Sequence, residues 1–348
     1  MKNIDNPQSV RKGENLDWAA LENYLRAHLP EAEGEMTYAQ FHGGHANLTY
    51  LLKFGDTEYV LRRPPFGKIA PGAHDMKREY RVLSKLYKHF SRAPRAFYLC
   101  EDAEIIGSKF VVVERRHGVV VRYKLADCFK DFPNAEKRLT LALIRAQADL
   151  HRVDVAAAGL SDLGRPDGFA RRQTEGWAKR WELAKTEENP QTDAVIAALA
   201  ADIPAPQAVS IVHNDIKFDN CQFQPDNPDE VTSVFDWDMT TIGDPLTDFG
   251  STLGYWPDAR FKDLKLPIML QGDFPDKNFV KEQYQKLTGY DLTHIAWYEA
   301  LAYLKATVIM QQLYARYLKG HSKDKRMAQM GEAAKVFSQM AARILGVD

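Results

Sequence analysis

The sequence predicts an α+β fold with two parts, a five-stranded antiparallel N-lobe over residues 1–115 and a mainly helical C-lobe over residues 116–348. Five segments with the alternating polarity of strands precede residue 116, and one long helical segment separates the third from the fourth. After residue 116, long stretches carry apolar residues at helical spacing. With 45% hydrophobic and 27% charged residues, the 348-residue chain has the composition of a globular protein.

In the N-lobe, Asp17 can cap an amphipathic helix over residues 18–29, which Pro30 ends. Glycine-containing turns at 43–44 and 55–56 indicate hairpins between the first three strands. The strands are expected at residues 36–41, 47–54, 58–63, 95–100 and 109–115, with a helix at 74–89.

In the C-lobe, the helical period is expected at residues 134–151, 167–185 and from 278 to the C-terminus. A β-like patch at residues 210–238 interrupts these helices.

Composition excludes several classes of function. The 46 Lys and Arg against 47 Asp and Glu give a net charge of -1, which offers no general affinity for nucleic acid. Cys100, Cys128 and Cys221 are too far apart in the sequence for a disulfide framework or a thiolate zinc site. No apolar stretch reaches the roughly 20 residues that span a bilayer, and no signal peptide is recognisable. We therefore expect a cytoplasmic protein, and the sequence does not indicate its oligomeric state.

The strongest chemical signal is the segment His213-Asn214-Asp215-Ile216-Lys217-Phe218-Asp219-Asn220. Asp215 and Asn220 have the five-residue spacing of the Asp and Asn in a kinase catalytic loop. There, a carboxylate orients or deprotonates a hydroxyl while an amide oxygen holds a metal ion on the phosphates. Sixteen residues later, Asp236 ends an apolar strand and is a candidate Mg²⁺ ligand. A lone Asp is more often a turn or cap residue, but this ordered set favours the catalytic interpretation.

The N-lobe offers residues for a nucleotide. The turn with Gly43, Gly44 and Asn47 can place backbone amides over phosphates, although a plain hairpin is the commoner meaning of Gly-Gly. Val60 and Arg62 lie on the strand that carries the phosphate-binding cation in kinases, and Glu79 on the next helix can pair with Arg62. The alternative for Glu79 is an exposed position on a solvated helix face.

These residues resemble the aminoglycoside phosphotransferase family, which has a protein-kinase-like bilobal fold. The likeness covers about residues 41–250 and ends in Phe235-Asp236-Trp237-Asp238, Gly243-Asp244-Pro245 and Asp248. The chain is most similar to the subgroup related to kinase domains fused to acyl-CoA dehydrogenases, through residues 59–65, 74–83, 150–154 and 172–181.

The resemblance implies transfer of a phosphoryl group from ATP or GTP, with Mg²⁺, to the hydroxyl of a small molecule. It implies catalytic roles for Asp215 and Lys217, metal binding by Asn220 and Asp236, and nucleotide binding near Glu114 and Arg115 in addition to the N-lobe residues above.

Three positions depart from the common pattern. Arg62 replaces the usual lysine and offers phosphate a planar fork. Asn214 replaces a frequent glycine, and asparagine tolerates a left-handed backbone. Lys217 matches protein kinases, where many small-molecule kinases have histidine, and the alternative for it is an exposed loop lysine. A protein kinase is disfavoured because Gly243-Asp244-Pro245 follows Asp236 too closely for a peptide-binding segment, and no Ala-Pro-Glu follows.

The acceptor is expected to meet the C-lobe. Arginine favours carboxylate or phosphate, and tryptophan offers apolar area, which together suit a hydroxyacyl compound or its coenzyme A thioester. A catalytically silent nucleotide- or partner-binding module and an aminoglycoside- or choline-type kinase are the alternatives. The candidate acceptor residues are Arg172, Gln173, Trp177, Arg180, Trp181 and Asp238.

Overall fold

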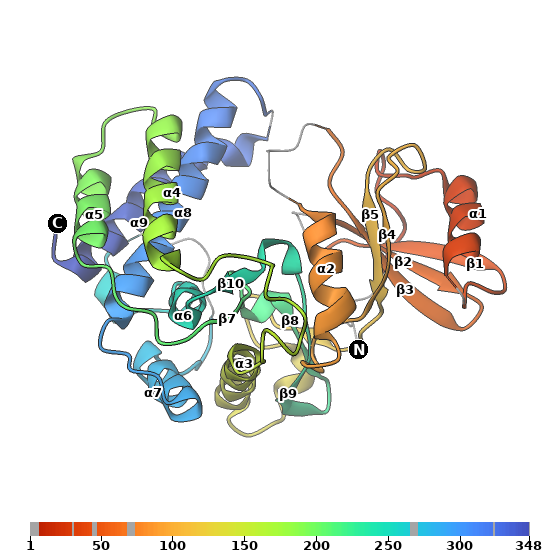
Figure 1. The fold of residues 1–348 in the computed structure, drawn as a ribbon, viewed down its shortest axis with the longest axis horizontal. Helices are drawn as coiled ribbons and strands as arrows, with labels where there is room; N and C mark the ends of the chain where they lie inside the picture. Colours follow the sequence, from red (N-terminus) through yellow and green to blue (C-terminus); the bar gives the residue numbers. More distant parts are fainter. Residues whose placement is uncertain are drawn as a thin grey trace. The chain divides into compact units, whose positions relative to one another are not determined.

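An antiparallel sheet of five strands forms the N-terminal part of the chain (Figure 1), in the order β1-β2-β3-β5-β4. The computed structural model describes residues 7–29, 31–43, 47–67, 74–264, 271–322 and 324–347. Each strand lies within one residue of its predicted position, and the predicted α+β fold is confirmed. The strands are β1 (Met36–Phe41), β2 (Leu48–Phe54), β3 (Thr57–Arg63), β4 (Ala96–Cys100) and β5 (Phe110–Glu114).

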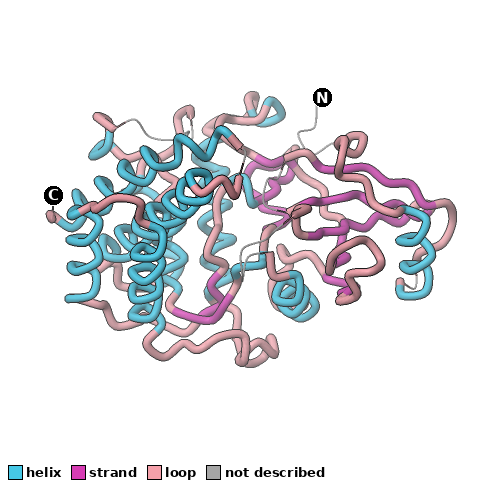
Figure 2. Tube along the Cα trace, turned by 90° about the horizontal axis from the view of Figure 1, so that it is seen from above, coloured by secondary structure: helices cyan, strands magenta, loops and turns pink. Residues whose placement is uncertain are grey.

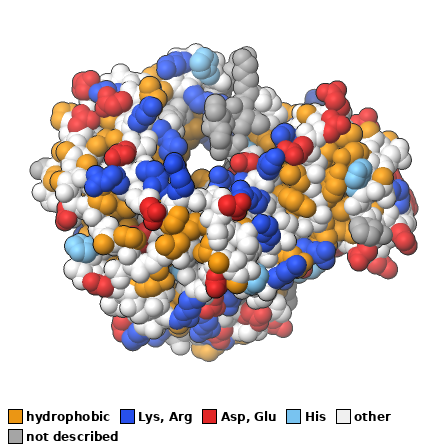
Figure 3. Space-filling view, viewed as in Figure 1, with side chains coloured by type: hydrophobic (Ala, Val, Ile, Leu, Met, Phe, Trp, Pro, Cys, Tyr) orange, Lys and Arg blue, Asp and Glu red, His pale blue; other side chains and the backbone are white. Residues whose placement is uncertain are grey.

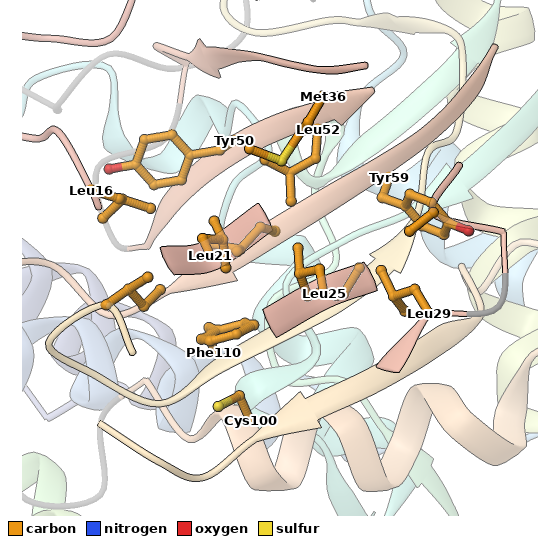
Figure 4. Close-up of a cluster of buried hydrophobic side chains, with 14 of the residues drawn as sticks. Leu16, Leu21, Leu25, Leu29, Met36, Tyr50, Leu52, Tyr59, Cys100 and Phe110 are labelled. Atoms are coloured by element: carbon orange, nitrogen blue, oxygen red, sulfur yellow. The ribbon is translucent and has the colours of Figure 1, made fainter. Parts of the chain in front are cut away.

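Helix α1 (Trp18–His28) packs on one face of this sheet (Figure 4). It begins where predicted, because the Asp17 side chain accepts a hydrogen bond from the Ala20 amide at 3.0 Å. Leu21 and Leu25, one turn apart on the helix, are fully buried in a hydrophobic cluster with strand residues. The strand residues include Tyr50, Leu52, Tyr59, Leu61, Phe110 and Val112.

Helix α2 (Met76–Leu86) lies on the opposite side of the sheet from α1 (Figure 1). Successive side chains of a strand point to opposite faces, so Leu61 joins the cluster under α1 while Arg62 points to α2. Because side chains alternate along β3, Arg62 rather than its neighbour Arg63 pairs with Glu79 of α2.

The residue contacts divide the chain into two units. The first consists of residues 1–146, 156–161 and 218–240, and the second of residues 147–155, 162–217 and 241–348. Strands predominate in the first and helices in the second (Figure 2). The boundary between two lobes that is expected at residue 116 differs from this division into units, and it stays a prediction.

The first unit also contains a three-stranded sheet in the order β6-β8-β9. Its strands are β6 (Val119–Val120), β8 (Cys221–Gln224) and β9 (Asn227–Val234). Most of helix α3 (Ala135–His151) belongs to this unit, and the last residues of α3 belong to the second. The β-like patch predicted at residues 210–238 is confirmed in these strands and in β7.

The second unit consists mainly of helices, with a two-stranded pair of β7 (Ser210–Val212) and β10 (Thr241–Gly243). Helices α5 and α6 were not predicted. All nine residues of α6 are buried, so it has no polar face from which a helical period could be read. The helices are α4 (Phe169–Ala184), α5 (Pro190–Ala201), α6 (Pro245–Leu253), α7 (Lys277–Thr288), α8 (Ile295–Leu318) and α9 (Met330–Leu345).

Helix α6 packs against α8 at Gly250. A Cβ atom at this position would lie 2.7 Å from the backbone of Tyr298 in α8, so only glycine permits this approach. The Tyr298 hydroxyl also donates to Asp244, the N-cap of α6, at 2.6 Å. The first turn of α6 is therefore fixed on α8.

The three cysteines are free thiols, two of them buried and Cys128 partly exposed. Within the described part of the chain, no helix combines the length and the apolar character that crossing a membrane requires.

Candidate active site

The loop that begins at His213 is positioned by a short strand pair in the second unit. Strand β7 leads into His213, and its residues Val212 and Ser210 pair with Thr241 and Gly243 of β10. Strand β10 leads into Asp244 and helix α6, whose first turn contains Asp248. Two segments far apart in the sequence thus meet at the start of the loop.

Asp248 is fully buried, and its side chain binds the backbone of the loop. Its Oδ2 accepts a hydrogen bond from the His213 amide at 3.0 Å, and its Oδ1 accepts one from the Asn214 amide at 2.7 Å. One carboxylate therefore fixes two consecutive peptide groups immediately before Asp215.

The charge on Asp248 is stabilised by His151, which lies 3.1 Å away through Nε2. The other ring nitrogen of His151 lies 2.6 Å from the Tyr284 hydroxyl, which orients the imidazole. Burial alone would raise the pKa of Asp248, but the hydrogen bonds and charges of His151 and His213 hold it below the ordinary value for aspartate.

The loop backbone is strained at Asn214, where φ is 73°. This left-handed conformation agrees with the expectation that Asn substitutes for glycine here. Lys305 of α8 donates from Nζ to the Asn214 carbonyl at 2.9 Å. Burial lowers the pKa of Lys305, Asp215 and Asp248 oppose the shift, and Lys217 and Arg180 add to it. Lys305 thus binds the carbonyl of the residue whose amide binds Asp248.

Both oxygens of the Asp215 carboxylate are engaged. The Tyr255 hydroxyl donates to Oδ1 at 2.5 Å, and Lys217 Nζ lies 3.0 Å from Oδ2. The Lys217 ammonium also lies 5.0 Å from the centre of the Tyr255 ring. The structure therefore brings the two predicted catalytic residues, Asp215 and Lys217, into direct contact.

The first unit contains a second group of predicted residues around Arg62. Its guanidinium forms an ion pair with Glu79 at 2.9 Å and with Asp236 at 2.7 Å. Burial raises the pKa of Glu79; Arg62 opposes this shift, whereas Asp236 and Asp238 reinforce it. Burial would lower the pKa of Arg62, but Glu79 and Asp236 raise it above the ordinary value, so Arg62 is a cation. The predicted Arg62–Glu79 pair is present, and Glu79 is buried rather than on a solvated face.

Asn220 and Asp236 come together through the sheet of β8 and β9. Strand β8 follows Asn220 directly, Cys221 pairs with Val234, and the Phe235 amide donates to the Asn220 carbonyl at 2.8 Å. An amide and a carboxylate are oxygen ligands of the kind Mg²⁺ takes together with phosphate oxygens. The donor set thus fits Mg²⁺ held partly by nucleotide. Among the described residues, no three His, Cys, Asp or Glu side chains form a complete metal site.

The glycine turn is described only in part. Gly44 lies outside the described residues. At Gly43, a Cβ atom would overlap the guanidinium of Arg122, a basic residue that sequence reasoning did not select. Asn47 is buried, and its side-chain amide makes no hydrogen bond to a described residue. Val60 is buried two residues before Arg62, where strand alternation gives both the same face.

The predicted nucleotide residues at the end of β5 have local partners. Glu114 accepts from the Arg95 amide at 2.9 Å and pairs with Arg116 at 3.1 Å. The Arg115 guanidinium lies over the ring of Phe41, 4.8 Å from its centre. Their role toward a nucleotide stays a prediction.

The candidate acceptor residues of α4 are placed differently from one another. Trp181 is buried and its indole donates to Asp193 at 3.0 Å, so this side chain serves packing between helices α4 and α5. Arg172 donates to the carbonyls of Arg165 and Asp167 before the helix. Trp177 and Gln173 are half-buried, and the Arg180 guanidinium lies 4.5 Å from the centre of the Trp177 ring.

Asp238 lies with the Arg62 group, since its charge acts on both Arg62 and Glu79. Its role toward an acceptor stays a prediction.

Sequence reasoning missed Lys305 and Tyr255. Lys305 is the one charged residue in the segment Leu304 to Met310 of α8, whose other residues are apolar or small. A single charge in such a segment is a signal in the sequence that the residue has a specific partner. Tyr255 gives no such signal, because its contact with Asp215 spans 40 residues of sequence.

A profile described as "Phosphotransferase enzyme family" matches residues 37–275. The chain belongs to this family. The match covers both the Arg62 group and the loop with Asp215, so membership supports small-molecule phosphotransfer.

Related sequences include the mouse protein named acyl-CoA dehydrogenase family member 10, which is 30% identical over 97% of this chain and 32% of its own length. Chicken acyl-CoA dehydrogenase family member 11 is 28% identical over 95% of this chain and 44% of its own length. This family member thus spans less than half of the curated relatives that it matches.

Among solved structures, a protein from Ralstonia eutropha, assigned provisionally as an aminoglycoside phosphotransferase, superposes with a TM-score of 0.77 at 29% identity, covering 95% of this chain and 99% of that one. A choline/ethanolamine kinase family protein from Mesorhizobium loti has a TM-score of 0.59 at 17% identity, with coverages of 95% and 98%. The second likeness supports the protein-kinase-like fold alone.

Replacing Asp248 by asparagine should destabilise the fold in a pH-dependent way. At about pH 7 the free energy of unfolding should fall by roughly 2–4 kcal/mol. The reason is that the side-chain amide of asparagine has one oxygen, whereas the two oxygens of Asp248 accept from the two backbone amides separately. Since the native pKa of Asp248 lies below its unfolded value, the wild-type advantage is complete above about pH 4 and shrinks as the pH falls further. Urea unfolding of both proteins, repeated from about pH 7 down to about pH 2, measures how this difference shrinks below about pH 4.

The matched control is Asp226→Asn, at an exposed aspartate outside this network. A stability difference between wild type and Asp248→Asn that stays constant or grows on acidification would contradict the assignment.

Proposed function

We propose that the chain transfers the γ-phosphoryl group of ATP or GTP to the hydroxyl of a small molecule, and that the acceptor is a hydroxyacyl compound or its coenzyme A thioester. The observation that carries the proposal is the Arg62 group: a cation between Glu79 and Asp236, with the backbone of Asn220 bonded to Phe235 beside it. This combination supplies a phosphate-binding cation and an oxygen donor set for Mg²⁺ on the same unit.

Asp215 orients the acceptor hydroxyl and takes its proton. The acceptor oxygen forms a bond to the γ-phosphorus, the bond from that phosphorus to the leaving nucleoside diphosphate breaks, and the proton passes to the carboxylate. Lys217, 3.0 Å from Asp215, offsets negative charge on the group in transfer. Because the transition state is loose, positioning is the main contribution of these residues.

In the first unit, Arg62 binds phosphate oxygens while Glu79 holds its guanidinium. Val60 would contact the base of the bound nucleotide, and the backbone at Glu114 and Arg115 would meet the edge of that base. Asn220 and Asp236 hold Mg²⁺, which when bound neutralises charge on the phosphates.

The proposed acceptor class follows from the charges near Asp215. Lys217 lies beside this carboxylate, and the charges of Asp215, Lys217 and Arg180 all act on Lys305. Trp177 lies under the Arg180 guanidinium. Lys and Arg side chains also gather on the helical unit in the face shown in Figure 3. An anionic acceptor with an apolar chain matches these side chains, whereas a polycation would be repelled. The names of the relatives contain acyl-CoA, which supports the same class.

The wild-type chain with Mg·ATP or Mg·GTP should phosphorylate hydroxyacyl compounds or their coenzyme A thioesters, and polycationic aminoglycosides such as kanamycin poorly. The expected result is a mass increase of one phosphoryl group on the acceptor, read by mass spectrometry. Asp215→Asn should lower kcat by on the order of 100-fold or more with little change in nucleotide affinity. Asp226→Asn serves as the control for the loss of one aspartate.

Efficient phosphorylation of an aminoglycoside, or of choline, with none of any hydroxyacyl compound would overturn the acceptor class alone. Nucleotide binding with no transfer to any acceptor would favour the silent binding module. Near-normal turnover by Asp215→Asn would remove that residue from the mechanism.

Replacing Asp236 by alanine should weaken magnesium-dependent nucleotide binding by on the order of 10-fold or more, because a charged oxygen ligand is lost. Arg62 keeps its ion pair with Glu79 in this variant, so the phosphate-binding cation stays in place. Calorimetric titration of Mg·ATP and of metal-free ATP into both proteins separates the metal contribution. An unchanged magnesium dependence would exclude Asp236 as a ligand.

A further inference from the structure

Tyr255 makes a contact that packing does not explain. Its side chain is 40% exposed, yet its hydroxyl donates to Asp215 at 2.5 Å. An exposed tyrosine hydroxyl can bond to water, so this contact is not needed to satisfy a buried polar group. The residue follows Gly254, the C-cap of helix α6.

The backbone of Tyr255 is fixed by α6. Its amide donates to the Thr252 carbonyl at 3.1 Å, and the Gly254 amide donates to Gly250 at the same distance. Asp248, on the first turn of the same helix, fixes the loop that carries Asp215. Helix α6 therefore holds the backbones on both sides of the hydrogen bond between Tyr255 and Asp215. Rotation of the Tyr255 side chain is enough to break this hydrogen bond.

Tyr255 and Lys217, which both contact Asp215, differ in chemistry. Lys217 supplies a positive charge to Oδ2, and a neutral group that approaches Oδ1 does not have to displace it. Tyr255 supplies to Oδ1 a neutral hydroxyl. An acceptor to be deprotonated by Asp215 must also present a hydroxyl within hydrogen-bond distance of this carboxylate.

We propose that Tyr255 occupies, in the free protein, the position on Asp215 that the acceptor hydroxyl takes, and that the acceptor displaces it. The inference rests on the proposed function of Asp215. Until an acceptor arrives, the phenol keeps water from Oδ1 and so restrains transfer of the phosphoryl group to water. In that hydrolysis, water oxygen would bond to the γ-phosphorus, the nucleoside diphosphate would leave, and Asp215 would take the proton.

The test is Tyr255→Phe, which keeps the ring beside Lys217 and removes only the hydroxyl. Release of nucleoside diphosphate from Mg·ATP without acceptor should rise by on the order of 10-fold, since a hydrogen bond to a charged group is lost. The KM for the acceptor should fall several-fold, and kcat should stay within about twofold, because the acceptor no longer competes with the phenol. Tyr123→Phe, at an exposed tyrosine of the other unit, is the matched control.

The outcomes separate the two proposals. If wild type transfers phosphate to an acceptor and Tyr255→Phe has unchanged hydrolysis and KM, this inference fails while the proposed function stands. A lower kcat with unchanged hydrolysis also overturns it, because Tyr255 then assists the reaction. Phosphate found on Tyr255 by mass spectrometry overturns it too, since the phenol would be an acceptor rather than its stand-in. No turnover by either protein, with or without acceptor, contradicts the proposed function itself.

Discussion

The buried carboxylate of Asp248 is the constraint on which the loop that carries Asp215 depends. It accepts hydrogen bonds from two consecutive amides, His213 and Asn214, and His151 stabilises its charge. Asn214, which supplies the second of these amides, has a left-handed backbone with φ of 73°. Lys305 of α8 donates to the carbonyl of Asn214, in the next peptide group of the loop. The position of Asp215 is therefore set by helix α6 and its neighbours rather than by the loop itself.

The Arg62 group depends on a different and simpler constraint, the alternation of side chains along β3. Leu61 faces the hydrophobic cluster under α1, and Arg62 faces Glu79 of α2. A shift of one residue in the register between β3 and its neighbours would bury Arg62 in the apolar cluster. The same packing that stabilises the sheet thus brings a cation and two carboxylates together, and their ion pairs offset the cost of burying these charges.

Sequence reasoning predicted what local patterns determine. The five strands, helix α1 with its Asp17 cap and the left-handed Asn214 follow from residue periods and backbone preferences that act over a few residues. The spacing of Asp215 and Asn220 identified the loop, and the family resemblance identified Asp248. It missed helix α6 because burial on all sides removes the amphipathic pattern. It also selected Trp181 as an acceptor residue; this side chain is buried, and its role toward an acceptor stays a prediction. The contacts of Tyr255 and Lys305 depend on how α6 and α8 pack, which no local pattern contains.

Amide hydrogen exchange at His213 and Asn214 tests most directly whether Asp248 fixes the loop. In the wild-type protein these two amides should exchange as slowly as those of the buried helix α6, although they lie outside regular secondary structure. In Asp248→Asn the His213 and Asn214 amides should lose more protection than the amides of α8. The variant lowers the stability of the whole protein, and in addition it removes the carboxylate that binds these two amides. Exchange of both amides in the wild type as fast as in exposed loops would contradict the account, since no carboxylate would then be holding them.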